Sequence, residues 1–213
     1  MAIDSLLRAC VARCGFVHRI AEFLARSGIS PNLLSLLSLA CAILAGLAFA
    51  LSGMARSATH LLVLALVCVC LNALLDGFDG LVARAEGRTS QRGDFLDHVV
   101  DRYADVFMIG GIIFGGYAGW RIGLVAMIGV LLASYMGTQA QAVGLNRLYG
   151  GVLGRADRIV MILTATALTL LYPLPVPSGG PVSFSSLGWL IVILAVLAHA
   201  TALQRIVHVW RRL

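Results

Sequence analysis

Residues 33–51 read LLSLLSLACAILAGLAFAL, a run that contains no charged side chain. An apolar run of about 20 residues is long enough to cross the hydrocarbon core of a bilayer as a helix. The whole chain has the same character, because 60% of its residues are hydrophobic, 12% are charged and the mean hydropathy is +0.92. This composition is far from that of soluble proteins and predicts an integral membrane protein.

Comparable stretches follow along the chain at 57–75, 94–118, 122–146, 159–177 and 187–204. The stretch 94–118 begins with carboxylates and then becomes wholly apolar, whereas the others contain almost no charge. We therefore expect an all-α integral membrane protein with six transmembrane helices. No long linker and no internal repeat interrupts the pattern, so residues 1–213 are predicted to form one domain whose six-helix bundle covers 30–213.

The basic residues indicate the orientation in the membrane. All sixteen are arginines, and in a six-span arrangement only Arg56 and Arg121 lie outside the connections of one side. The positive-inside rule makes that side cytoplasmic, so both termini and the active site are expected at the cytoplasmic face of the cell membrane. The net charge of +6 does not indicate nucleic acid, because the arginines are spread along membrane edges; anionic lipid headgroups are the expected partner.

Residues 1–28 precede the first predicted span and mix apolar with charged side chains. Arg8, Arg13, Arg19 and Arg26 are spaced among leucine, alanine, cysteine and phenylalanine. This pattern is typical of an amphipathic helix that lies in the membrane interface. A solvated helical arm is the alternative.

The stretch 76–101, DGFDGLVARAEGRTSQRGDFLDHVVD, holds six of the ten acidic residues of the chain. Asp76 and Asp79 are three residues apart, and Asp97 and Asp101 are four apart, so each pair shares one helix face. The intervening turn, RAEGRTSQR, would fold the two faces together. Four carboxylates gathered at a membrane edge repel one another and are costly without compensating cations.

Two divalent cations would supply the compensating charge. Oxygen ligands without histidine or cysteine suit Mg²⁺ or Mn²⁺, and paired divalent ions are used to stabilise both sides of a phosphoryl displacement. The bare faces formed by Gly77, Gly80, Ala83 and Gly93 indicate that a ligand approaches the backbone there. Arg84 is then a candidate for a substrate phosphate. Alternatively, the carboxylates form ion pairs with local arginines, namely Arg84, Arg88, Arg92 and Arg102.

The order D-x2-D-G-x2-A-R-x8-G-x3-D-x3-D resembles the signature of the CDP-alcohol phosphotransferases, and the likeness extends from Ser30-Pro31-Asn32 to about Arg158. The resemblance implies a six-helix membrane enzyme, usually a homodimer, in which an acceptor hydroxyl displaces CMP from a CDP-linked lipid. It implies Asp76, Asp79, Asp97 and Asp101 as metal ligands and Asp101 as the general base. It further implies contacts with the CDP group from Asp79, Gly80, Ala83, Arg84 and Gly93.

The acceptor alcohol is less closely defined. The arginines around the connection at 147–158 and at the end of the last span could bind an acceptor phosphate: Arg147, Arg155, Arg158 and Arg205. Alternatively, they only mark the cytoplasmic side. The run GDFLDHVVDRYAD and the turn GRADR resemble the inositol-phosphate branch of the family, which favours inositol 1-phosphate as acceptor; glycerol 3-phosphate and serine remain alternatives.

Two further expectations concern other functions and packing. A divalent-cation transporter would also need carboxylates, but it would place them near the bilayer midplane along a path. Gly111, Gly115 and Gly119 form a stripe of small residues that permits close helix contact. We expect this stripe to pack within the six-helix unit; a dimer contact is the alternative.

Overall fold

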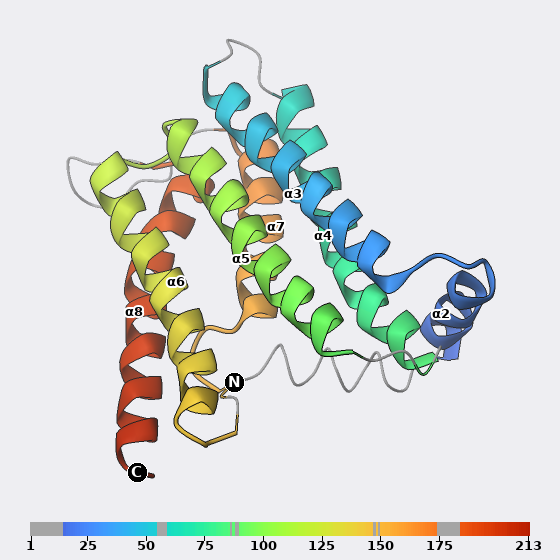
Figure 1. The fold of residues 1–213 in the computed structure, drawn as a ribbon. Coiled ribbons are helices and arrows are strands. Elements are labelled where there is room, and N and C mark those ends of the chain that lie inside the picture. Colours follow the sequence, from blue (N-terminus) through green and yellow to red (C-terminus); the bar gives the residue numbers. More distant parts are fainter. Residues whose placement is uncertain are drawn as a thin grey trace.

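The structure is a computed structural model that describes residues 15–54, 59–85, 87, 90–146, 148, 150–173 and 184–213. Helices account for nearly all of these residues (Figure 1). Their bounds are α2 Gly15–Arg26, α3 Pro31–Met54, α4 Thr59–Ala85, α5 Gln91–Phe114, α6 Trp120–Ala142, α7 Arg155–Leu171 and α8 Ser186–Trp210.

Two serine caps set the helix starts that flank the acidic motif. At α3, Pro31 occupies the first helical position and the Ser30 hydroxyl accepts from the Leu33 N–H at 3.3 Å. At α5, the Ser90 hydroxyl accepts from the Gly93 N–H at 3.1 Å. The predicted turn between the two carboxylate pairs is confirmed, because α4 ends at Ala85 and α5 begins at Gln91.

The helices α3 to α8 run side by side in alternating directions (Figure 1). Helix α3 packs against both α4 and α5, α6 packs against α8, and α7 contacts α4 and α8. Their inward faces form one apolar core, whose fully buried side chains include Phe49, Met108, Ile162 and Leu194. This arrangement brings the end of α4 and the starts of α5 and α7 to the same end of the bundle (Figure 1).

Glycines let α3 and α5 approach closely. A Cβ atom on Gly111 would lie 2.1 Å from the carbonyl oxygen of Gly46, and one on Gly115 would lie 2.5 Å from that of Phe49. The expectation that the stripe packs within the unit is therefore confirmed for these two positions. It is wrong for Gly119, because α5 ends at Phe114 and Gly119 precedes α6 with open space around it.

Gly115→Leu is expected to destabilise the fold by about 3 kcal/mol, the upper end of the usual cost of overpacking, because backbone lies where the side chain would go. Thermal unfolding of the detergent-purified protein measures the effect, and Gly119→Leu is the matched control with no expected loss. A Gly115→Leu protein with unchanged thermal stability but altered oligomeric state would instead assign this glycine to an intermolecular contact.

Within the part of the chain that the structure describes, four helices are long and apolar enough to cross a membrane: α3, α4, α6 and α8. The predicted span at 159–177 is not among them, because α7 ends at Leu171 and has 17 residues. The α5 helix has 24 residues, but its first half carries the acidic motif and two arginines. The described helices thus identify an all-helical membrane protein with four clear spans, and six crossings stay a prediction.

Helix α2 covers only part of the predicted interfacial arm, since residues 1–14 lie outside the described residues. Its buried residue Ala21 packs with Leu34 of α3 and Val82 of α4. Phe16 and Phe23 are exposed, at 70% and 68% of their surface. Large aromatic side chains on the outer face of a helix at the edge of a membrane protein fit the predicted place in the interface.

Candidate active site

Three motif carboxylates converge where α4 ends and α5 begins. One oxygen from each of Asp76, Asp97 and Asp101 lies within 4.8 Å of the others, which is close enough to share a cation. Asp76 and Asp101 are largely buried, with 17% and 10% of their side chains exposed. Helical spacing places Asp97 and Asp101 on one face of α5, and the packing of α4 and α5 against α3 adds Asp76.

The fourth motif carboxylate, Asp79, lies outside this group. It is buried, its Oδ2 accepts from the Ser35 hydroxyl of α3 at 2.6 Å, and its Oδ1 accepts from the Gly80 N–H at 2.5 Å. Ser35 was not identified from the sequence, although it is a polar residue near the start of an apolar helix. This contact fixes the motif end of α4 against α3.

Arg155, the first residue of α7, compensates the charge of the group. Its Nη1 forms an ion pair with Asp76 and lies 2.8 Å from Asp101 Oδ1. The carboxylates therefore do form ion pairs with arginines, as the alternative to a metal site predicted. Their main partner, however, is Arg155, which that alternative did not include. Of the four that it named, Arg102 bonds Asp101 at 3.2 Å, Arg88 lies outside the described residues, and Arg84 and Arg92 are exposed.

A second ion pair lies one helical turn deeper. Arg158 Nη2 donates to Asp105 Oδ2 at 2.6 Å, and the two residues are 3% and 1% exposed. Asp105 was not identified from the sequence, although it continues the four-residue spacing of Asp97 and Asp101. The site thus contains a buried carboxylate beyond the motif.

Buried polar atoms remain without hydrogen-bond partners in this cluster. Among the described residues, Arg155 Nε and Nη2, Arg158 Nε, Asp76 Oδ1 and Asp105 Oδ1 have none. Buried donors and acceptors are normally paired, so atoms of this kind are expected where a ligand binds. The site combines free donors suited to an anion with a free carboxylate oxygen suited to a cation.

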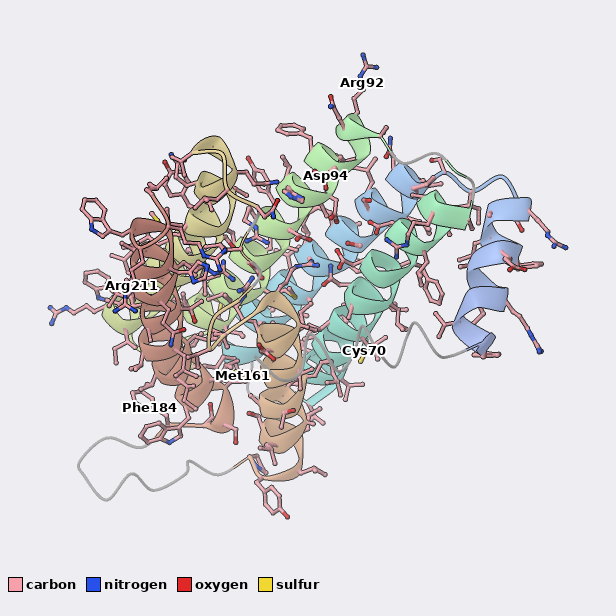
Figure 2. The ribbon with its side chains drawn as sticks, turned by 90° about the horizontal axis from the view of Figure 1, so that it is seen from below. Cys70, Arg92, Asp94, Met161, Phe184 and Arg211 are labelled. Atoms are coloured by element: carbon pink, nitrogen blue, oxygen red, sulfur yellow. The ribbon has the colours of Figure 1, made fainter. Side chains whose placement is uncertain are left out.

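The predicted CDP-contacting residues lie in the last two turns of α4 and the first turn of α5. A Cβ on Gly80 would meet only the flexible side chain of Arg84, at 3.5 Å, and one on Gly93 would meet Ser90 Oγ at 3.3 Å. Ala83 is partly buried. Only side-chain atoms therefore lie near the two glycines, and their contact with a nucleotide stays a prediction. Arg92, by contrast, extends away from the helices (Figure 2).

The connection before α7 is hydrogen-bonded to α8. The Leu153 N–H donates to Thr201 Oγ1 at 3.0 Å, and the Val152 N–H donates to Gln204 Oε1 at 3.1 Å. Arg205 Nε donates to the Gly150 carbonyl at 2.9 Å, and its Nη1 donates to the Ala133 carbonyl. Arg205 therefore holds the connection before α7, and Arg147 lies outside the described residues.

A charged site at one end of an apolar helix bundle, with clustered carboxylates beside buried arginines, is the arrangement of a membrane enzyme that handles phosphorylated headgroups. The chain belongs to the CDP-alcohol phosphatidyltransferase family, whose sequence pattern matches residues 28–210. It is accordingly a phosphotransferase, and the predicted family is confirmed.

Named relatives are similar over most of the chain. Archaetidylinositol phosphate synthase of Pyrococcus horikoshii is 29% identical over 92% of this chain and 92% of its own length. Phosphatidylinositol phosphate synthase of Streptomyces avermitilis is 33% identical over 90% of this chain and 76% of its own length.

Solved structures of phosphatidylinositol phosphate synthase from Mycobacterium tuberculosis are 26% identical to this chain. The form with bound CDP-DAG has a TM-score of 0.72 and covers 91% of this chain and 92% of its own. The complex with manganese and citrate has a TM-score of 0.73, covering 90% and 88%. The likeness therefore extends through the whole bundle.

Proposed function

We propose that this protein transfers the lipid phosphate group of a CDP-linked lipid to a hydroxyl of inositol 1-phosphate and releases CMP. The acceptor assignment rests on a pair of arginines one turn apart on α7, Arg155 and Arg158. Among the described residues, Arg155 Nε and Nη2 and Arg158 Nε are buried donors without partners. Such groups lie beside the carboxylate group, where an acceptor phosphate would gain charge-assisted hydrogen bonds.

The carboxylates fit a divalent-cation site. Asp76, Asp97 and Asp101 offer hard oxygen ligands in one group, and Asp76 Oδ1 is buried without a partner among the described residues. We infer that Asp79 joins them when it turns from Ser35. Two Mg²⁺ or Mn²⁺ ions held there would polarise the pyrophosphate and stabilise the charge on the leaving CMP. Manganese in the related solved structure supports this assignment.

The CDP group is assigned to the turn that joins α4 and α5. Accessible backbone at Gly80 and Gly93 leaves space for the nucleotide, Ala83 is small, and the exposed Arg84 can reach a phosphate. Asp79 lies next to Gly80 on α4, and its carboxylate can accept from the ribose. CDP-DAG bound to the structural relative supports a nucleotide-lipid donor for this fold.

The reaction forms one P–O bond and breaks another. The acceptor hydroxyl oxygen attacks the lipid phosphorus, the pyrophosphate bond to CMP breaks, and the hydroxyl proton passes to the Asp101 carboxylate as general base. Arg155 and Arg158 orient the acceptor through its own phosphate. Arg205 contributes by holding the connection before α7. A role for Arg147 in binding the acceptor phosphate stays a prediction from the sequence.

Glycerol 3-phosphate would satisfy the same arginines and is the second candidate. The two named relatives favour inositol phosphate, because their names identify archaetidylinositol phosphate and phosphatidylinositol phosphate synthases. Serine lacks the phosphate that these arginines would bind.

The membrane arrangement that we propose has six crossings within a single domain of residues 1–213, with residues 1–28 as the interfacial arm. Alternating helix directions support it, since the end of α4, the starts of α5 and α7 and the end of α8 then share one face (Figure 1). Positive-inside asymmetry makes that face cytoplasmic, in the cell membrane. A homodimer is inferred from the family resemblance.

CMP release by the detergent-purified protein tests the function. With CDP-lipid and inositol 1-phosphate, we expect release that stops on chelation with EDTA and returns with Mn²⁺ or Mg²⁺. A reaction that continues after complete chelation would contradict the metal assignment. Release with glycerol 3-phosphate but not with inositol 1-phosphate would move the proposal to the second candidate.

A further inference from the structure

We propose that Asp105 is a positioning residue for the acceptor phosphate, acting through Arg158. The inference rests on the proposed function, because it assumes that Arg158 binds that phosphate. Asp105 lies one helical turn beyond Asp101 on α5, outside the eight positions of the family motif. Its partner Arg158 lies one turn beyond Arg155 on α7.

The two helices are joined by two successive ionic contacts. Asp101 meets Arg155 at 2.8 Å near the end of the bundle, and Asp105 meets Arg158 at 2.6 Å one turn deeper. Arg102 lies between them, at 3.2 Å from Asp101 Oδ2 and 4.0 Å from Asp105 Oδ2. Carboxylates and guanidinium groups therefore alternate from the motif into the core.

The deeper contact restricts the Arg158 side chain more than a surface ion pair would. Both partners are almost fully buried, so the guanidinium cannot turn toward water and the ionic hydrogen bond is not screened. One Nη donates to Asp105, while Nε is buried without a partner among the described residues. Asp105 thus anchors the guanidinium through Nη2 and leaves the Nε donor available to an anion.

A purely structural role is the competing explanation. A buried arginine requires a countercharge whether or not it binds substrate, and the loss of either partner of such a pair typically costs about 3–5 kcal/mol of stability. Stability alone therefore cannot test the proposal. The discriminating quantity is the KM for the phosphorylated acceptor, compared with the KM for CDP-lipid and with kcat.

Asp105→Val removes the anchoring carboxylate with little change in volume. We expect the KM for inositol 1-phosphate to rise about tenfold, with kcat and the KM for CDP-lipid within about twofold of the parent protein. Asp105→Asn keeps an oxygen acceptor for Arg158 and is expected to restore part of the affinity. Thr166→Val, which removes a buried hydroxyl bonded to Ile162 of the same helix, controls for general destabilisation of α7.

An unchanged acceptor KM in Asp105→Val, or an equal rise in both KM values, would overturn the inference. If Asp105→Val does not fold, Asp105→Asn is measured with and without Arg158→Gln. A change in acceptor KM that disappears in the Arg158→Gln background supports positioning through Arg158, whereas no change, or an equal change in both backgrounds, contradicts it. If the parent protein itself does not use a phosphorylated acceptor, the proposed function fails before any variant is compared.

Discussion

Asp76→Asn and Asp97→Asn are each expected to lower CMP release by at least about a thousandfold, because the loss of a charged metal ligand removes about 4 kcal/mol of transition-state stabilisation. Both carboxylates belong to the group that can share a cation. Asp79→Asn is expected to have a comparable effect if that residue joins the site. Steady-state CMP release at saturating CDP-lipid and acceptor measures the loss.

Two controls separate this effect from damage to the fold. Asp94→Asn removes a carboxylate of α5 that is 75% exposed and lies outside the group of Asp76, Asp97 and Asp101. The activity of this variant should remain close to that of the parent. Mn²⁺ binding, followed by electron paramagnetic resonance of the detergent-purified protein, should weaken in the Asp76 and Asp97 variants but not in Asp94→Asn. A variant of either residue with near-normal turnover would exclude that residue from the metal site.

Asp101→Asn separates the two roles assigned to Asp101. As the general base it is required only in the reaction, so this variant should lose turnover while retaining affinity for CDP-lipid. Direct binding of CDP-lipid to the purified variant distinguishes the outcomes. If binding is also lost, Asp101 acts chiefly as a metal ligand.

Free inositol is expected to be a poorer acceptor than inositol 1-phosphate by about two to four orders of magnitude in kcat/KM. Each charge-assisted hydrogen bond to the phosphate contributes about 1.5–3 kcal/mol, and Arg155 and Arg158 supply at least one each. An uncharged acceptor also leaves their buried donors without partners, which adds to the discrimination. Competition between the two acceptors for one preparation of enzyme measures the ratio.

Variants of Arg155 and Arg158 test whether these two residues of α7 produce the selectivity for a phosphorylated acceptor. Arg158→Gln should raise the acceptor KM by about one to two orders of magnitude with little change in the KM for CDP-lipid. Arg155→Gln should do the same, but it also releases Asp76 and Asp101, so its effect extends to the metal site. Arg211→Gln, at the exposed end of α8, is the control. Efficient use of free inositol or serine, or an unchanged acceptor KM in both variants, would contradict this role. The arginines would then only mark the cytoplasmic side of the membrane.

The sequence alone was sufficient for the class of protein, for its all-helical character and for the turn between the carboxylate pairs. These features depend on local properties: apolar length determines membrane insertion, serine and proline mark helix starts, and the 3.6-residue period places Asp97 and Asp101 on one face. The family signature has the same local character, since all eight of its positions lie within 76–101. The bounds of α7 were harder to predict from the sequence, because the helix begins at Arg155, before its apolar run.

The partners of the charged residues were decided only by the tertiary structure. Arg155 and Asp76 are 79 positions apart, Arg158 and Asp105 are 53 apart, and Ser35 and Asp79 are 44 apart. Spacing along one helix determines which face a side chain occupies, but the residue opposite it depends on which helix packs there and at what depth. In a bundle of apolar helices many packings bury similar apolar area, so the buried ion pairs became visible only when α4, α5 and α7 were placed together.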